Sequence, residues 1–175
     1  MTRPYVEFRN KRLWHKIDYD GAYGYQCTDL IKQYLDECLW RWKQKALWNA
    51  NQIPANLEKQ WFKKLSVDNI MQWDLIVRTK WSLWHIAIVD RIIGNCVSVL
   101  EQNGSWKNSW SWEWQNAIRI KEYDRNWFQV ILRNDDIIKN FNKELKYVNE
   151  KLDERERYLK LTIDYKNALT FKSNN

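Results

Sequence analysis

The chain has 175 residues, of which 45% are hydrophobic and 29% are charged, and this balance excludes a disordered or collagen-like protein. We expect neither a membrane span nor a secretory signal, because no run approaches roughly 18 apolar residues and residues 1–16 lack an apolar segment. The net charge of +7 favours an anionic partner such as nucleic acid, a membrane surface or a cell-wall polymer, although a mildly basic surface gives the same value. The 13 tryptophans and four glycines are unusual, since average glycine usage is about 7%.

Cysteine and histidine are scarce in this sequence. The three cysteines, Cys27, Cys38 and Cys96, cannot all form disulfides, and none lies in a CxxC pair that would indicate a zinc or redox site. Because the chain holds only His15 and His85, we do not expect a histidine-based metal site.

Helical periodicity comes first along the chain. Apolar residues recur at helical spacing over residues 27–39, which predicts an amphipathic helix, and a shorter helix is expected over residues 56–65. Short β-branched runs then predict strands at 74–78, 85–93, 97–102, 117–122 and 128–133. Gly94-Asn95 lies between two of these runs and is typical of a hairpin turn. Helices followed by an antiparallel sheet predict an α+β fold, with the N-terminal helices packed on the sheet.

A second helical pattern begins at Ile137, where apolar residues repeat at spacings of three and four. We therefore divide the chain into a globular domain, residues 1–134, and an amphipathic, coiled-coil-like helical tail, residues 135–175. Residues 137–160 would serve self-association or attachment, or else lie back on the domain. The stretch 104–115, rich in Ser and Trp, is expected to be a loop.

Three features of the first domain together indicate nucleophilic catalysis. Cys27 stands at the predicted start of the first helix, where unpaired N–H groups favour a thiolate, although a lone cysteine is more often buried filler. His85 begins an apolar strand, where a single histidine is more often structural. Glu101, Gln102 and Asn103 end the next strand, and a hairpin would bring a carboxylate or an amide to the imidazole. Together they match the nucleophile, base and orienter of papain-like hydrolases.

These segments resemble the CHAP family, the cysteine, histidine-dependent amidohydrolases and peptidases that cut bacterial peptidoglycan. The matching segments are, in order, DYDGAYGYQCTDL at 18–30, DLIV at 74–77, HIAIV at 85–89 and EQNG at 101–104. The resemblance covers roughly residues 12–133. It implies a papain-like (NlpC/P60-like) α+β fold for the domain.

The resemblance also implies a role for each residue of the site. Cys27 would be the nucleophile, His85 the general base and Glu101 the orienter, with Asn103 assisting it. The backbone N–H of Cys27, aided by Gln26, would stabilise the oxyanion. The reaction would be attack on an amide carbonyl, formation of an acyl-enzyme and hydrolysis by water, without an organic cofactor.

The implied function is peptidoglycan hydrolysis, by an N-acetylmuramoyl-L-alanine amidase or by an endopeptidase of the peptide cross-bridge. A phage lysin or a virion-associated hydrolase would be made in the host cytoplasm and act on the cell wall without a signal peptide. The alternative is a non-catalytic, basic and aromatic-rich module that binds cell-wall glycan or nucleic acid. No RRM, KH or zinc-knuckle signature supports nucleic acid as the partner.

The loop before Cys27 suggests a structural calcium ion. Asp18 and Asp20 flank a turn, and Asp29 follows one helical turn past the bend, so that carboxylate oxygens of the kind Ca²⁺ prefers gather there. The CHAP resemblance implies the same three aspartates as ligands, together with the carbonyls of Ala22 and Gly24. Otherwise Asp18 and Asp20 form a simple turn, and Asp29 pairs with a lysine.

Several tryptophans stand where CHAP domains usually carry glycine, notably Trp73 before DLIV, Trp84 before His85 and Trp48 before Asn-Ala. Reading every tryptophan as glycine would make 104–115 an ordinary Gly/Ser-rich loop and bring the glycine content into the usual range. We therefore hypothesise UGA codons, which some uncultured bacteria and their phages read as glycine, translated here as tryptophan. The alternative is a genuine carbohydrate-stacking surface or aromatic core. Any position with positive φ would tolerate tryptophan poorly.

Overall fold

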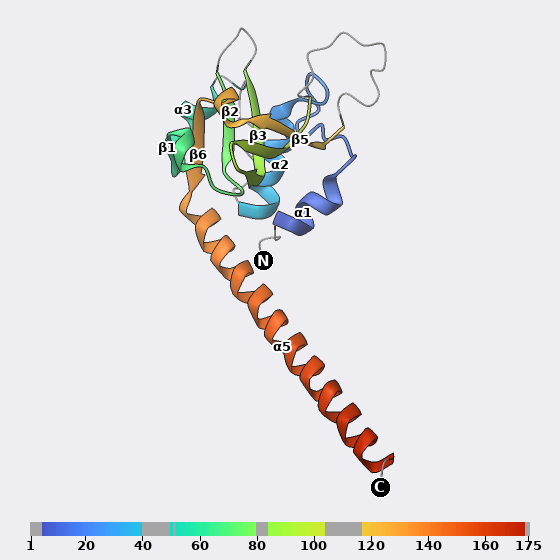
Figure 1. Ribbon diagram of the computed structural model, residues 1–175. Helices are drawn as coiled ribbons and strands as arrows, with labels where there is room; N and C mark the ends of the chain where they lie inside the picture. The colour runs from blue at the N-terminus through green and yellow to red at the C-terminus, as the bar shows by residue number, and fades with distance from the viewer. Residues whose placement is uncertain (1–4, 40–49, 51, 80–83, 104–116, 174–175) are drawn as a thin grey trace. The chain divides into compact units, whose positions relative to one another are not determined.

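The protein is described by a computed structural model, which defines residues 5–39, 50, 52–79, 84–103 and 117–173 (Figure 1). The chain divides into two compact units, Met1–Ile137 and Ile138–Asn175. The first unit contains helices and an antiparallel sheet. The last helix, α5 (Asp135–Ser173), begins at the end of the first unit and makes up the described part of the second.

The sheet of the first unit has six strands in the spatial order β1-β6-β2-β3-β4-β5, and every neighbouring pair is antiparallel. The strands are β1 (Phe62–Leu65), β2 (Leu75–Arg78), β3 (His85–Ile93), β4 (Cys96–Glu101), β5 (Arg119–Asp124) and β6 (Val130–Asn134). Two 3₁₀ turns, η1 (Val67–Asn69) and η2 (Arg125–Trp127), lie between strands. The strands β2 to β5 are therefore neighbours in chain order, and β6 returns to the other side of β2.

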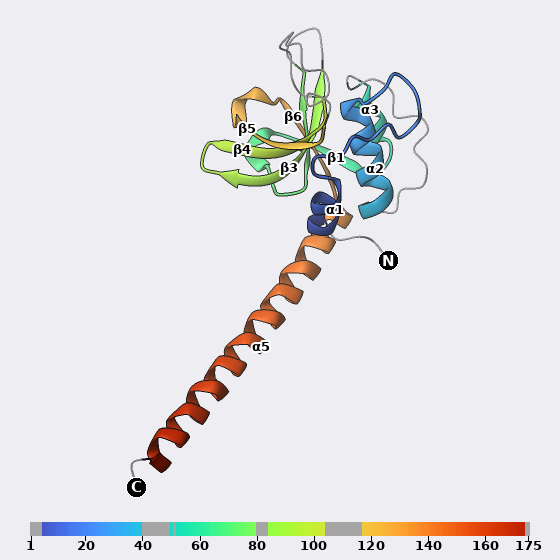
Figure 2. The same cartoon turned by 90° about the vertical axis from the view of Figure 1, so that its right-hand side faces the viewer.

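Among the described residues, the helices that accompany the sheet are α1 (Tyr5–Arg12), α2 (Cys27–Leu39) and α3 (Ile53–Glu58). α2 packs on β3, α1 packs on α2, and α3 contacts β1 and β6. Figure 2 shows α2 to one side of the sheet. The apolar residues of α2 share one face because of their helical spacing, and Leu30, Ile31 and Leu35 are completely buried there. Each such side chain contributes about 1.5–3 kcal/mol by leaving water.

Both faces of the central strands are buried, which explains why their sequences are continuous apolar runs rather than alternating ones. The cluster on one face includes Ile76, Val89 and Ile131, with Phe128 packed among them. The residues that alternate with these along the strands, such as Leu75, are also completely buried. Strands buried on two sides form a rigid platform for the side chains at their ends.

The α+β arrangement is confirmed, and the helix at 27–39 and the strand at 85–93 have the predicted bounds. The other four predicted strands are observed with ends displaced by one or two residues. The predicted helix over residues 56–65 is wrong. Helix α3 lies earlier and carries Pro54 in its first turn, and Phe62–Leu65 forms β1 because it pairs with β6. Helix α1 was not predicted, and the expected loop at 104–115 lies outside the described residues.

Several tryptophans occupy an unusual backbone conformation. Among the tryptophans that the structure describes, Trp14, Trp61 and Trp73 have φ values of 68°, 79° and 73°, whereas Trp84 and Trp127 do not have positive φ. A positive φ is found for only a few per cent of non-glycine residues, and for a bulky residue it is an outlier. Glycine adopts this conformation without steric cost.

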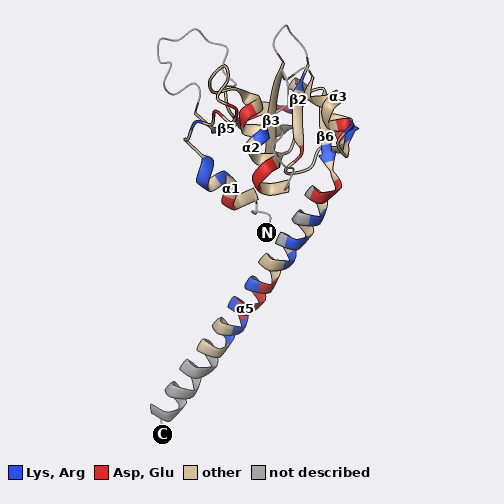
Figure 3. Cartoon of the chain, turned by 180° about the vertical axis from the view of Figure 1, so that it is seen from behind, with Lys and Arg blue, Asp and Glu red and all other residues tan. Residues whose placement is uncertain are grey.

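Helix α5 carries exposed apolar residues among charged ones. Leu145, Val148, Leu152 and Leu159 are 48–56% exposed. Figure 3 shows basic and acidic residues, coloured blue and red, along the same helix. Within the described residues, no helix combines the length and the apolar character needed to cross a bilayer.

Candidate active site

Cys27 is the first residue of α2, at a helix end that favours negative charge. The Asp29 side chain reaches back to the residue before Cys27, which is one half of a capping box, and fixes this helix start. The Gln26 N–H donates to Asp29 Oδ2 at 2.9 Å, and the Asp29 N–H donates to the Gln26 carbonyl at 3.1 Å. The thiol is therefore held in place by local sequence, and Cys27 is only 9% exposed.

His85 and Glu101 meet at the ends of two paired strands. His85 begins β3 and Glu101 ends β4, and the imidazole Nε2 lies 3.0 Å from Glu101 Oε2. The imidazole also forms a hydrogen bond with the Cys27 side chain. Because Nε2 faces the carboxylate, Nδ1 is the ring nitrogen left for the thiol. The structure thus brings together the three residues predicted as nucleophile, base and orienter.

Their electrostatic coupling is strong. Burial by itself would lower the pKa of His85, but hydrogen bonds with Cys27 and Glu101 raise this pKa to about 9. Burial would raise the pKa of Glu101, but His85, followed by Tyr123 and Arg119, lowers it to about 2. At neutral pH the site therefore holds an ionised Glu101 beside a protonated His85.

Two further side chains hold the Glu101 carboxylate. The Tyr123 hydroxyl donates to Oε2 at 2.8 Å, and Arg119 Nε donates to Oε1 at 3.1 Å. Both residues lie on β5, whose register places Arg119 opposite Glu101. Sequence reasoning missed them. The available signal was the alternation of side chains along a strand. Arg119 and Tyr123 are an even number of residues apart, so they lie on one face of a strand next to β4.

Two amides connect the end of β4 to the loop before Cys27. The fully buried Gln102 side chain accepts from the Ile17 N–H at 2.9 Å and donates to the Gln26 carbonyl at 2.9 Å. The predicted assistant, Asn103, donates to Gln26 Oε1 at 3.3 Å, so its amide positions Gln26. Gln26, the predicted oxyanion donor, gives one N–H to the Tyr23 carbonyl at 2.8 Å, and among the described residues its second N–H meets no acceptor.

The three carboxylates predicted as calcium ligands lie together. One carboxylate oxygen from each of Asp18, Asp20 and Asp29 falls within 4.8 Å of the others. Lys32, only 3% exposed, forms an ion pair with Asp20, and its Nζ lies 3.5 Å from Asp29 Oδ1. The hydrogen bond from Lys32 is the main cause of the lowered pKa of Asp20, whereas burial raises the pKa of Asp29. Carboxylate oxygens suit Ca²⁺. The single ammonium of Lys32 does not neutralise three carboxylates, so the cluster keeps an excess of negative charge.

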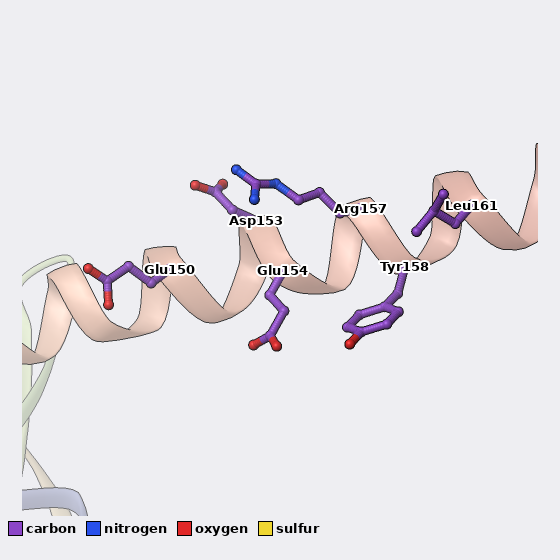
Figure 4. A pocket seen from close by; sticks show the side chains of 6 residues that line it. All are labelled: Glu150, Asp153, Glu154, Arg157, Tyr158 and Leu161. Atoms are coloured by element: carbon purple, nitrogen blue, oxygen red, sulfur yellow. The ribbon is translucent and has the colours of Figure 1, made fainter.

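A separate surface hollow lies along helix α5 and is drawn in Figure 4. Its walls are the side chains of Glu150, Asp153, Glu154, Arg157, Tyr158 and Leu161. All six come from one helix, so the hollow is open and contains no residue of the catalytic set. We assign no function to it.

Comparison with known proteins identifies similar folds. No protein-family model matches the sequence, and no curated protein matches it either. The structure is similar to that of the wild-type endolysin LysIME-EF1, with a TM-score of 0.58 and 19% identity over 77% of this chain and 65% of that protein. The Ly7917 structure, also solved with the hydrolysing product of MDP, is similar at TM-scores of 0.46 and 0.47 and 14–15% identity, over 62% of this chain and 53% of that one. The chain therefore spans less than two thirds of either protein and shares its fold with an endolysin.

Proposed function

We propose that the protein is a peptidoglycan hydrolase of papain-like fold and CHAP type, which cleaves an amide bond of the cell wall through Cys27, His85 and Glu101. The observation that carries the proposal is the buried hydrogen-bonded series from Cys27 through the His85 ring to Glu101. The shared fold with an endolysin, a protein that acts on the bacterial cell wall, adds support.

Each group would contribute a defined step. The Cys27 thiolate forms a bond to the amide carbonyl carbon, and the oxyanion is met by the Cys27 N–H and the second amide N–H of Gln26. The C–N bond then breaks as His85 transfers its proton to the leaving amine, which leaves an acyl-enzyme. Water next adds to the acyl carbon while His85 takes up its proton, and the C–S bond breaks to release a carboxylate and the thiolate.

The scissile bond is one of two amides. Cleavage between muramic acid and the stem peptide would make the protein an amidase, and cleavage in the cross-bridge would make it an endopeptidase. Both reactions use the same three groups, so the catalytic geometry is equally compatible with either. Mass spectrometry of the new termini in digested peptidoglycan separates them.

The decisive test is clearing of a suspension of purified cell walls. Cys27→Ala should abolish clearing, because Cys27 is the group that would form the acyl-enzyme. Cys96→Ala is the matched control, since Cys96 is an exposed thiol at the start of β4, and it should leave the rate unchanged. Equal clearing by wild type and Cys27→Ala would rule out the cysteine mechanism. Binding to walls without hydrolysis would favour the non-catalytic alternative.

We also propose that Asp18, Asp20 and Asp29 hold a structural Ca²⁺, with the carbonyls of Ala22 and Gly24 completing its oxygen shell. Bound there, the ion would fix the loop that leads into Cys27. To bind, it must displace the Lys32 ammonium from Asp20. Calcium should raise the Tm of the wild-type chain but not that of Asp18→Asn. An equal Tm of both proteins with Ca²⁺ or with EDTA would show that Lys32 alone neutralises the loop.

A further inference from the structure

We propose that Arg119 and Tyr123 are positioning residues for the catalytic pair, an inference that rests on the proposed hydrolase function. Glu101 is completely buried, and its two oxygens are held from different directions. Arg119 approaches Oε1 with Nε at 3.1 Å and Nη2 at 3.0 Å, whereas Oε2 accepts from Tyr123 at 2.8 Å and faces His85 at 3.0 Å.

These contacts fix the orientation of the carboxylate. A carboxylate offers about four acceptor sites, and here the donors are Arg119 Nε, the Tyr123 hydroxyl and the imidazole, with Arg119 Nη2 in ion-pair contact. Tyr123 is itself held by ring contacts with Trp127 and Phe128, at centroid distances of 5.3 and 5.5 Å. Rotation of the carboxylate away from His85 would break all of these interactions at once.

Arg119 also controls the charge that His85 experiences. Its guanidinium neutralises part of the Glu101 charge from the side opposite the imidazole. Without it, the full negative charge would hold the imidazolium proton more tightly, and a more tightly held proton is transferred less readily to the leaving amine. The Tyr123 hydroxyl also weakens the hold of the carboxylate on the His85 proton, because it donates to Oε2, the same oxygen that faces the imidazole. Burial and Glu101 both raise the pKa of Tyr123, so its hydroxyl remains a donor.

The kinetic test uses Tyr123→Phe and Arg119→Gln, with Glu122→Gln as the control because Glu122 is an exposed residue of the same strand. We expect each of the first two to lower kcat about tenfold with little change in KM, since a hydrogen bond to a buried charge is lost. The control should match wild type. Arg119→Lys keeps the charge and should recover part of the loss. Unchanged kcat in folded Tyr123→Phe and Arg119→Gln would overturn the proposal.

A second readout does not depend on activity. The chain has two histidines, so the ring protons of His85 can be titrated by NMR with the exposed His15 as internal reference. In a Cys27→Ala background, Arg119→Gln and Tyr123→Phe should raise the His85 pKa by about one unit and leave that of His15 unchanged. An unmoved His85 titration refutes the positioning role. Failure of wild type to hydrolyse walls, with the His85 shift present, refutes the proposed function alone.

We further infer that the natural protein carries glycine at Trp14, Trp61 and Trp73, and this inference rests on the backbone alone. At Trp73 the N–H donates to the Val89 carbonyl at 2.7 Å, and the Val89 N–H donates to the Asp74 carbonyl at 2.9 Å. Trp73 and Asp74 thus lie opposite the single residue Val89, and this arrangement is a β-bulge. Its first residue has φ 73°, the conformation for which such bulges use glycine.

The same geometry recurs at Trp14. Its N–H donates to the Ile118 carbonyl at 2.8 Å, and the Ile118 N–H donates to the His15 carbonyl at 2.8 Å. Trp14 also follows the end of α1 by two residues, where helices commonly end on a left-handed glycine. Trp61 lies between α3 and β1 with φ 79° and is 78% exposed, so no packing compensates for its strain. The glycines Gly21, Gly24 and Gly94 share this conformation.

Mass spectrometry of the protein from its natural source tests this inference. Tryptic peptides 65–78, 60–63 and 13–16 contain one of these tryptophans each. We expect glycine masses in all three. Peptide 126–133 contains position 127, which does not have positive φ. Glycine there as well would show that the codon, and not the backbone conformation, determines where glycine occurs, as expected if UGA is read as glycine. Tryptophan masses in peptides 13–16, 60–63 and 65–78 would overturn the inference, as would UGG codons at those positions.

Discussion

The backbone at Trp61 makes a quantitative prediction about stability. We compare Trp61→Gly with Trp61→Ala, and Trp127→Gly with Trp127→Ala. Within each pair the indole ring is lost from both variants, so its packing cancels and the difference reports the backbone. Trp61 has φ 79°, and Trp127 has no positive φ, so the two positions should rank glycine and alanine in opposite orders.

The expected magnitudes follow from two opposing effects. An L-residue in the left-handed region costs about 1–2 kcal/mol, which glycine does not incur. Glycine loses more chain entropy on folding, which costs about 0.4–1 kcal/mol relative to alanine. Trp61→Gly should therefore be more stable than Trp61→Ala by about 0.5–1 kcal/mol. At position 127 only the entropy effect operates, so the glycine variant should be less stable by a similar amount.

Urea unfolding at constant m-value measures these differences, and thermal unfolding should show about 2–4 °C for each kcal/mol. Trp14, with φ 68° and 65% of its surface exposed, supplies a replicate of Trp61. If alanine proved more stable than glycine at Trp14 and Trp61, as it should at Trp127, the backbone argument for glycine would fail.

Three other predictions concern activity and assembly. Because the His85 pKa of about 9 lies above its ordinary value of 6.5, the stabilisation from its pairing is fully present below pH 6.5 and lost as pH rises through 9. Both kcat/KM and the urea midpoint of wild type should fall over that interval. The urea midpoint of Glu101→Gln should fall less, and an equal fall in both proteins would argue against the pairing of His85 with Glu101. A chain that carries Trp84 next to the base should hydrolyse walls weakly, and Trp84→Gly should raise the rate; robust hydrolysis by the unmodified chain would contradict this. If helix α5 mediates self-association, sedimentation should show a concentration-dependent dimer that Leu152→Lys removes, and a monomer at all concentrations would contradict it.

Local sequence was sufficient wherever neighbouring residues decide the structure. The α2 helix was predicted with its observed bounds because its apolar spacing is local, and the Gln26–Asp29 hydrogen bond that fixes its start lies in the same segment. The strand at 85–93 was likewise predicted, since a β-branched run ending at Gly94 needs no distant partner to be identified. The strand Phe62–Leu65 was mistaken for helix because pairing with β6 decides its conformation, and β6 lies far along the chain.

The sequence by itself determined that the chain has an α+β domain followed by a helical segment, and it predicted the candidate site residues, of which Cys27, His85 and Glu101 lie together in the structure. The residues by themselves left open whether a carboxylate or an amide meets His85, and the tertiary structure shows that Glu101 contacts the imidazole whereas the Asn103 amide donates to Gln26. It also decided that Arg119 and Tyr123 surround the carboxylate, since a strand contributes side chains to a site through its neighbours in the sheet. The tryptophan excess was visible in the composition. That some of these tryptophans occupy glycine-like positions was shown by their φ angles, because β-bulges and helix ends impose these angles and the composition does not contain them.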